Sequence, residues 1–183
     1  ADQAGFVGTK LDTVVIRGFN DDECGNIISF VRERNIEARF IEYMDVGDSN
    51  GWKLDEVVPS SEIVELIGTY LPLEPIAPNY PGEVASRWRY TDGNGEIGLI
   101  SSVSQPFCGD CSRLRLSARG ELFTCLFASS GHDVRSLLRS NASDETIVDT
   151  VTSLWRSRDD RYSELRSSQS QQVARVEMSY IGG

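Results

Sequence analysis

The chain contains the stretch Phe107-Cys-Gly-Asp-Cys-Ser112 and, after a hairpin pattern, the stretch Phe123-Thr-Cys-Leu-Phe127. Two residues separate Cys108 from Cys111, and thirteen residues lie between Cys111 and Cys125. Three thiolates at this spacing are typical of a soft-metal site or an iron–sulfur cluster. A cluster with three protein ligands leaves one iron open, whereas a structural zinc site needs a fourth ligand. The cysteines alone therefore leave both metals open.

The residues between the cysteines predict a hairpin that brings them together. Residues 113–116 and 121–124 have strand character and flank the turn Ser117-Ala-Arg-Gly120. Arg113 and Arg115 alternate on the first expected strand, so both side chains should leave the same face and bind one anion. The pattern therefore places a small anion site beside the metal site.

The fourth cysteine and the one histidine bear on the choice of metal. Cys24 falls on an apolar helical stripe with Ile28 and Val31, so we interpret it as a core residue. His132 follows Cys125 by seven residues and could complete a Cys₃His zinc site. A zinc-stabilised binding or scaffold module is therefore the alternative hypothesis.

Length and composition indicate a globular chain without a broad surface for binding polyanions. With 183 residues and 39% hydrophobic content, the chain can bury a core in one domain or two small ones. Its net charge of −10 argues against a nucleic-acid partner and against an anionic membrane surface. No apolar run approaches the roughly 20 residues of a membrane span, and no signal segment opens the chain, so we expect a cytoplasmic protein. A single histidine and the lack of a phosphate-binding glycine-rich loop also exclude common hydrolase and P-loop chemistry.

The first part of the chain predicts a βαβ unit. Strands are expected at residues 10–16 and 37–44, with Asn20 as the N-cap of the intervening helix and Glu42 among the polar positions of the second strand. Open α/β folds bind ligands at the carboxyl ends of their strands. We therefore expect the polar loop 45–51 to line a pocket.

The later part has a different character. Pro59 opens a helix, and four prolines between residues 72 and 81 interrupt regular structure. Residues 83–90 and 96–101 predict a hairpin, and Ser143 caps an amphipathic helix. The charged run 159–166 is interpreted as a solvated helix end.

Four stretches together resemble the GTP 3′,8-cyclase family, also called molybdenum cofactor biosynthesis protein A. They are Gly18-Phe-Asn-Asp-Asp-Glu23, Arg39-Phe-Ile-Glu-Tyr-Met44, Gln105-Pro-Phe-Cys-Gly-Asp-Cys-Ser-Arg-Leu-Arg-Leu-Ser117 and Gly182-Gly183. The resemblance runs from about residue 5 to the last residue and covers half of the family's chain. The Cys-x₃-Cys-x₂-Cys motif of the family's N-terminal half, which binds the first [4Fe–4S] cluster and S-adenosylmethionine, is not in this sequence.

The resemblance implies an α/β to α+β fold. Residues 1–71 would be the last part of an incomplete (β/α)₆ TIM-like barrel. Residues 72–183 would form an antiparallel-hairpin and helical extension that bears a second [4Fe–4S] site. Without the first barrel half, the strand near Lys10 would be an exposed edge, so we expect a homo-oligomer.

The resemblance also assigns roles to individual residues. Cys108, Cys111 and Cys125 would ligate the second cluster, whose open iron takes the guanine of GTP. Arg113, Leu114 and Arg115 would contact the nucleotide. Lys10 and Arg39 would help to bind its triphosphate, and Met44 would contact S-adenosylmethionine. Arg113 and Arg115, with Gly182 and Gly183 of a tail that reaches the active site, would serve catalysis.

The implied activity is that of a radical S-adenosylmethionine lyase. The complete enzyme would convert GTP to (8S)-3′,8-cyclo-7,8-dihydroguanosine 5′-triphosphate in molybdenum cofactor (molybdopterin) biosynthesis. The implied partners of this chain are GTP and the N-terminal half of the same enzyme. Because the radical source belongs to that other half, we expect the chain to be inactive alone.

Overall fold

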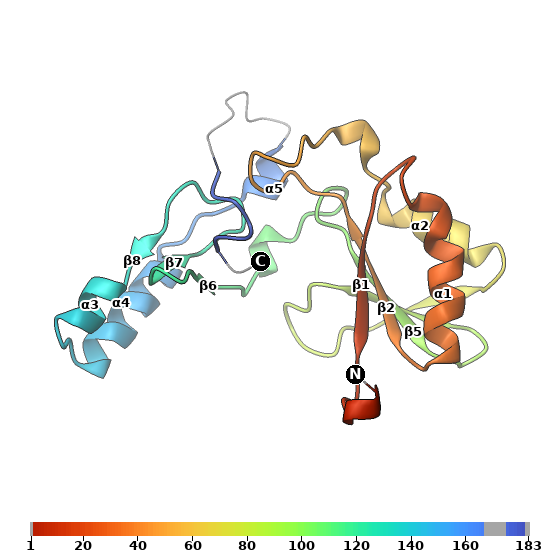
Figure 1. Ribbon diagram of the computed structural model, residues 1–183, viewed down its shortest axis with the longest axis horizontal. Helices are drawn as coiled ribbons and strands as arrows, with labels where there is room; N and C mark the ends of the chain where they lie inside the picture. The colour runs from red at the N-terminus through yellow and green to blue at the C-terminus, as the bar shows by residue number, and fades with distance from the viewer. Residues whose placement is uncertain (1, 167–174, 182–183) are drawn as a thin grey trace. The chain divides into compact units, whose positions relative to one another are not determined.

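The computed structural model describes residues 2–166 and 175–181. The chain is a mixed α/β protein with one five-stranded mixed sheet and one three-stranded antiparallel sheet (Figure 1). It divides into two compact units, the first made of Ala1–Met44 and Trp52–Asp110, the second of Asp45–Gly51 and Cys111–Gly183. Within the described residues, no helix has the length and apolar character needed to cross a membrane.

The first unit is built on the five-stranded sheet. Its strands, in spatial order, are β1 (Lys10–Val15), β2 (Glu37–Glu42), β5 (Glu96–Ile100), β4 (Ser86–Tyr90) and β3 (Leu73–Ile76). The pairs β1–β2 and β2–β5 are parallel, whereas β5–β4 and β4–β3 are antiparallel. The expected βαβ unit and the expected hairpin are both confirmed, and they share one sheet.

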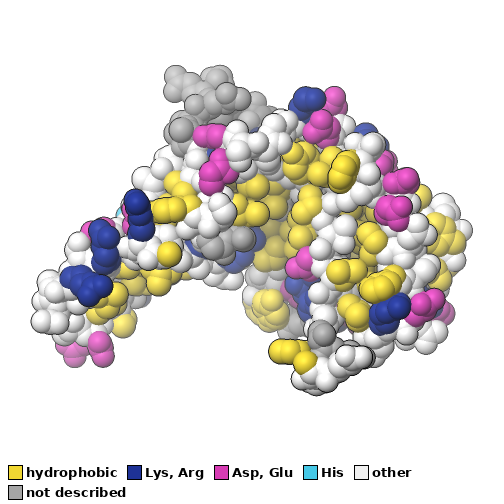
Figure 2. All heavy atoms as spheres, viewed as in Figure 1, with side chains coloured by type: hydrophobic (Ala, Val, Ile, Leu, Met, Phe, Trp, Pro, Cys, Tyr) yellow, Lys and Arg dark blue, Asp and Glu magenta, His cyan; other side chains and the backbone are white. Residues whose placement is uncertain are grey.

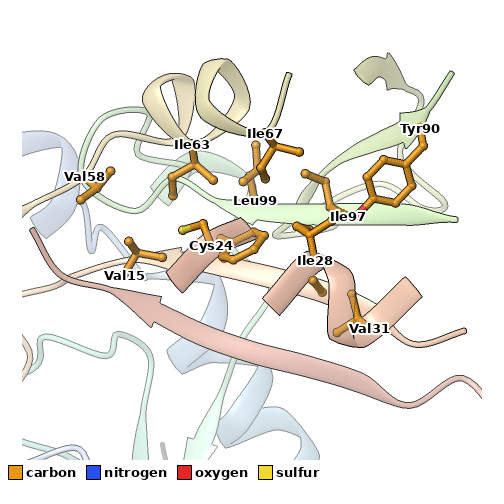
Figure 3. Packing of buried hydrophobic residues seen from close by; sticks show 12 residues of the cluster. Val15, Cys24, Ile28, Val31, Val58, Ile63, Ile67, Tyr90, Ile97 and Leu99 are labelled. Carbon is orange, nitrogen blue, oxygen red and sulfur yellow. The ribbon is translucent and has the colours of Figure 1, made fainter. Parts of the chain in front are cut away.

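Two helices, α1 (Cys24–Glu33) and α2 (Ser60–Gly68), pack their apolar stripes on one face of this sheet. Figure 3 shows their buried side chains gathered against those of the strands. Cys24 is 1% exposed in this core, which confirms its interpretation as a core residue. Each fully buried aliphatic side chain contributes roughly 1.5–3 kcal/mol. The cluster therefore holds the helices to the sheet.

The boundary expected between residues 71 and 72 runs through this first unit. β5 pairs in parallel with β2 and in antiparallel fashion with β4. Strands on both sides of the boundary therefore belong to one sheet.

The first unit also contains short 3₁₀ turns, which are η1 (Asp2–Ala4), η2 (Asp21–Glu23), η3 (Leu54–Glu56) and η4 (Cys108–Asp110).

The expected N-cap at Asn20 is wrong. The turn η2 lies between Asn20 and α1, and the Asn20 side chain makes no capping hydrogen bond. Its Oδ1 instead accepts from the backbone N–H of Ile16 at 2.8 Å, and its Nδ2 donates to the Val14 carbonyl at 2.9 Å. Asparagine often bonds nearby backbone in this way, and here it closes the turn that follows β1.

The second unit contains short elements. Its sheet consists of β6 (Arg115–Leu116), β7 (Glu121–Phe123) and β8 (His132–Asp133) in that order. Its helices are α3 (Arg135–Arg139), α4 (Asp144–Arg156) and α5 (Tyr162–Leu165). The hydroxyl of Ser143 accepts from the Thr146 N–H at 3.3 Å, which confirms the predicted cap of α4. On the face shown in Figure 2, acidic and basic side chains are interspersed.

Glu42, at the end of β2, is a buried carboxylate and not the polar surface position that the sequence suggests. Its side chain is 0% exposed. It accepts from the backbone N–H groups of Ser60, Val103 and Ser104, each at 2.8 Å, and from the hydroxyls of Ser60 and Ser104. Ser60 is the first residue of α2, so this acid also compensates the positive end of a helix.

Replacing Glu42 with glutamine should destabilise the first unit by about 3 kcal/mol. The amide keeps the volume, but its NH₂ faces donors that then have no acceptor, and buried unsatisfied groups cost about 1–3 kcal/mol each. Urea unfolding measures the change. Glu65→Gln, on the exposed side of α2, is the matched control and should stay within about 0.5 kcal/mol of the wild type. Equal effects of the two substitutions would contradict the assignment.

Candidate cluster and nucleotide site

The three clustered cysteines are half-buried and are not joined in disulfides. Cys108 begins η4 in the first unit, whereas Cys111 and Cys125 belong to the second unit, before β6 and after β7. Across residues 2–166 and 175–181, no group of three or more His, Cys, Asp or Glu side chains is arranged to hold a metal ion. The complete ligand set therefore stays a prediction.

The surroundings of two of these thiols suit a bound thiolate. The Nε–H of Arg113 donates to Cys111 Sγ at 3.4 Å, and the backbone N–H of Phe127 donates to Cys125 Sγ at 3.4 Å. Burial raises the pKa of the Cys111 thiol, but the N–H groups and charge of Arg113, helped by the charge of Arg158, lower this pKa below its ordinary value. Thiolate is the form that binds metals. The donor chemistry of Cys111 and Cys125 therefore fits an iron–sulfur cluster.

Arg113 and Arg115 lie in different parts of the chain near the cysteines, one before strand β6 and one in it. β6 begins at Arg115, and Arg113 lies in irregular chain before it, so the expected placement of both on one strand face is wrong. Burial and then Arg113 lower the pKa of Arg115, and the thiols of Cys111 and Cys125 oppose this shift. Arg115 thus lies near both thiols. Leu114, between the arginines, is 38% exposed.

Arg158 is a further basic neighbour that the sequence interpretation missed. Its Nη1 donates to the carbonyl oxygen of Cys111 at 2.7 Å, and its guanidinium lies 4.3 Å from the ring centre of Trp155. It therefore fixes the backbone of a candidate ligand. The spacing of three or four residues between Trp155, Arg158, Tyr162 and Arg166 is the signal that could have revealed it.

Lys10 and Arg39 lie on the sheet face of the first unit opposite the helices, where both contact one carboxylate. Lys10 Nζ is 3.2 Å from Glu37 Oε2, and Arg39 Nε is 2.9 Å from Glu37 Oε1. A Cβ on Gly98 would lie 3.1 Å from Arg39 Cγ. The glycine therefore leaves room for Arg39 to lie across β5. The structure brings these two predicted residues together.

The remaining predicted residues are placed as follows. Met44 is half-buried just after β2. Gly182 and Gly183 lie outside the described residues. His132 is exposed on β8, where it pairs with Leu122. Within the described part of the second unit, His132 does not join Cys111 and Cys125 in a metal-holding group.

Asp45 centres a buried ionic cluster in the second unit. It is 7% exposed and accepts from the Tyr162 hydroxyl, from Arg166 Nε at 3.0 Å and from Arg175 Nη1 at 3.0 Å. The Tyr162 ring stacks on Phe127 with 4.5 Å between centroids. The interpretation of residues 159–166 as a solvated helix end is therefore wrong, because Tyr162 and Arg166 turn inward to Asp45.

Comparison with known proteins identifies the family of this chain. Residues 36–164 match the family described as Molybdenum Cofactor Synthesis C. The chain therefore belongs to this family, and the sequence resemblance is confirmed.

Curated relatives name a particular enzyme. The GTP 3′,8-cyclase of Acidothermus cellulolyticus is 49% identical, over 100% of this chain and 58% of its own length. Those of Synechococcus sp. strain CC9902 and Xanthomonas campestris strain 8004 are each 46% identical, over 95% and 100% of this chain. They are covered over 50% and 53% of their length. The chain thus spans about half the length of these relatives and matches their C-terminal part.

The Asp45 cluster predicts an acid-sensitive second unit. Burial raises the pKa of Asp45, but the Tyr162 hydroxyl and the charges of Arg166 and Arg175 lower it below its ordinary value. A depressed folded pKa gives stability that is present above the unfolded pKa of about 3.9 and is lost as the pH falls through the folded pKa. Thermal unfolding of the wild type should lose stability below about pH 4, and Asp45→Asn should show less of this loss.

The control for this pH series is Asp159→Asn, which changes an exposed acid on the same stretch as Tyr162. It should keep the acid dependence of the wild type. An Asp45→Asn variant with an unchanged slope between pH 5 and pH 3 would show that Asp45 is not the group responsible.

Proposed function

We propose that this chain is the GTP- and cluster-binding part of a GTP 3′,8-cyclase, a lyase of molybdenum cofactor biosynthesis. The observation that carries the proposal is the pairing of thiols with arginines, in which Arg113 and Arg158 contact Cys111 and Arg115 lies near both Cys111 and Cys125. Soft ligands and fixed positive charge in one place suit a cluster that meets an anionic substrate.

In this proposal Cys108, Cys111 and Cys125 hold a [4Fe–4S] cluster, which supplies an iron with an open position for the guanine of GTP. Arg113, Leu114 and Arg115 contact the nucleotide. The protein orients the substrate and neutralises its charge, and such positioning can account for a large part of a rate enhancement. The family assignment and the donor chemistry of Cys111 and Cys125 support this reading.

Lys10 and Arg39 are proposed to bind the triphosphate. Both cations now share the carboxylate of Glu37. Half-exposed ion pairs contribute little to stability, so a triphosphate can take over the two cations at small cost. Met44 is proposed to contact S-adenosylmethionine, and Gly182 and Gly183 to approach the reacting nucleotide.

We further propose that the first unit is the last part of an incomplete (β/α)₆ TIM-like barrel. β1 lies at one end of the strand order of its sheet, and its open edge would pair with the half of the enzyme that the relatives carry N-terminal to the matched part. That half would supply the first cluster and S-adenosylmethionine. The chain by itself would then be inactive in converting GTP to the cyclised triphosphate, and its open edge would favour self-association.

Anaerobic reconstitution with iron and sulfide tests the cluster. We expect about four irons per chain, since three thiolates can hold one [4Fe–4S] cluster. Serine at Cys108, Cys111 or Cys125 should each lower the iron content. Cys24→Ala should keep it, because Cys24 is a core residue of the first unit. One tightly held zinc that His132→Ala abolishes would refute the proposal in favour of the zinc module.

Arg158→Gln should make the cluster easier to remove. The substitution deletes a charge-assisted hydrogen bond to the Cys111 carbonyl, and changes of groups that orient metal ligands typically lower metal affinity about 10- to 100-fold. A chelator should therefore take iron from the reconstituted variant about tenfold faster than from the wild type. Arg156→Gln, a change of an exposed arginine two residues earlier, is the control. Equal rates for both variants would exclude this role of Arg158.

A further inference from the structure

Two segments of the second unit that are far apart in the sequence are joined by reciprocal hydrogen bonds. One is the loop Asp45–Gly51, and the other is the C-terminal segment, defined as residues 175–181. Each segment offers an acid to the other. Asp45 of the loop binds Arg175, and Glu177 of the C-terminal segment binds the loop backbone.

The first joint is ionic and buried. Arg175 Nη1 donates to Asp45 Oδ2 at 3.0 Å and also to the Asp45 carbonyl, while the side chains are 14% and 10% exposed. The Arg175 guanidinium also lies 4.4 Å from the ring centre of Tyr162. The backbone N–H of Arg175 donates to Asp48 Oδ2 at 3.0 Å. Such a pair is directional, because the planar guanidinium fixes the approach of its partner.

The second joint requires a glycine. Glu177 Oε1 accepts from the Asp48 N–H at 2.9 Å, and Oε2 accepts from the Ser49 hydroxyl at 3.0 Å. Gly47 has a φ of +64°, and a Cβ there would overlap the Glu177 carboxylate. Positive φ and close approach are the two conditions that favour glycine. The loop is therefore shaped to receive this acid.

Beyond these joints, the C-terminal segment is attached to the core of its unit. The Val176 N–H donates to the Ala128 carbonyl at 3.1 Å, just after the Cys125 loop. The Tyr180 hydroxyl donates to Glu121, and Ile181 is 1% exposed. These contacts hold the C-terminal segment on the rest of the second unit.

We propose that Asp45 and Glu177 form a two-point latch that seats residues 175–181 on the loop Asp45–Gly51. Asp45 and Glu177 are positioning residues, since they act through the segment that they hold. The latch does not depend on the proposed function.

Hydrogen exchange of the full chain, measured by mass spectrometry, tests the latch. In Asp45→Asn and Arg175→Gln, the amides of residues 175–181 should exchange at least tenfold faster than in the wild type. Arg175→Lys keeps the charge and one donor, so it should restore part of the protection. Glu177→Gln changes a half-exposed side chain and should loosen the same segment in a chain that remains folded.

The control is again Asp159→Asn, which should leave the exchange of residues 175–181 unchanged. Faster exchange in Asp45→Asn that extends equally to α4 would overturn the latch, because it would show a general loss of stability. Unchanged exchange in both Asp45→Asn and Glu177→Gln would also overturn it.

This measurement separates the latch from the proposed function, because it needs neither cluster nor GTP. A wild-type chain that binds no iron, yet loses protection of residues 175–181 in the variants, would keep the latch and refute the cluster. A wild-type chain that binds about four irons would support the cluster. If hydrogen exchange of residues 175–181 in the same chain were insensitive to substitution of Asp45 and Glu177, the latch would be refuted.

Discussion

Two buried acids at the end of β2 organise both units of the chain. Glu42 is the last residue of β2, and Asp45 follows three residues later. The carboxylate of Glu42 accepts from N–H and hydroxyl donors at the start of α2 and in the loop after β5. That of Asp45 accepts from a tyrosine and two arginines of the second unit. A buried carboxylate without donors is costly. Each acid therefore fixes the segments that supply its donors, and Met44 lies between them in the sequence.

The second unit concentrates positive charge in an acidic protein. The chain carries a net charge of −10, yet Arg113 and Arg158 lower the pKa of the Cys111 thiol, and Arg115 lies near Cys111 and Cys125. Burial opposes the charge of Arg115, so this side chain gains from an anion nearby. Local chemistry, and not net charge, therefore decides what the unit can bind.

The sequence predicted features that depend on short-range periodicity. The βαβ unit, the hairpin of β4 and β5, the core position of Cys24 and the Ser143 cap all follow from patterns within about ten residues. Burial of polar side chains could not be predicted in this way. Glu42 meets its donor Ser104 across 62 residues of sequence, and Asp45 meets Arg175 across 130. Such acids look like surface residues until the fold brings their partners to them.

In the candidate site, too, local patterns were predictable from the sequence and long-range contacts were not. Cysteine spacing and the paired arginines are local signals. Arg113 does contact Cys111, but it lies outside the strand because β6 is only two residues long. Arg158 meets Cys111 across 47 residues. Lys10 and Arg39 were assigned from resemblance, and the register of β1 and β2 supplies what the sequence could not, the shared carboxylate of Glu37. Asp12, the register partner of Arg39, lies on the same face of the sheet, so two acids and two cations meet there. The register of the two strands therefore decides which of these charges meet, and sequence spacing alone does not show it.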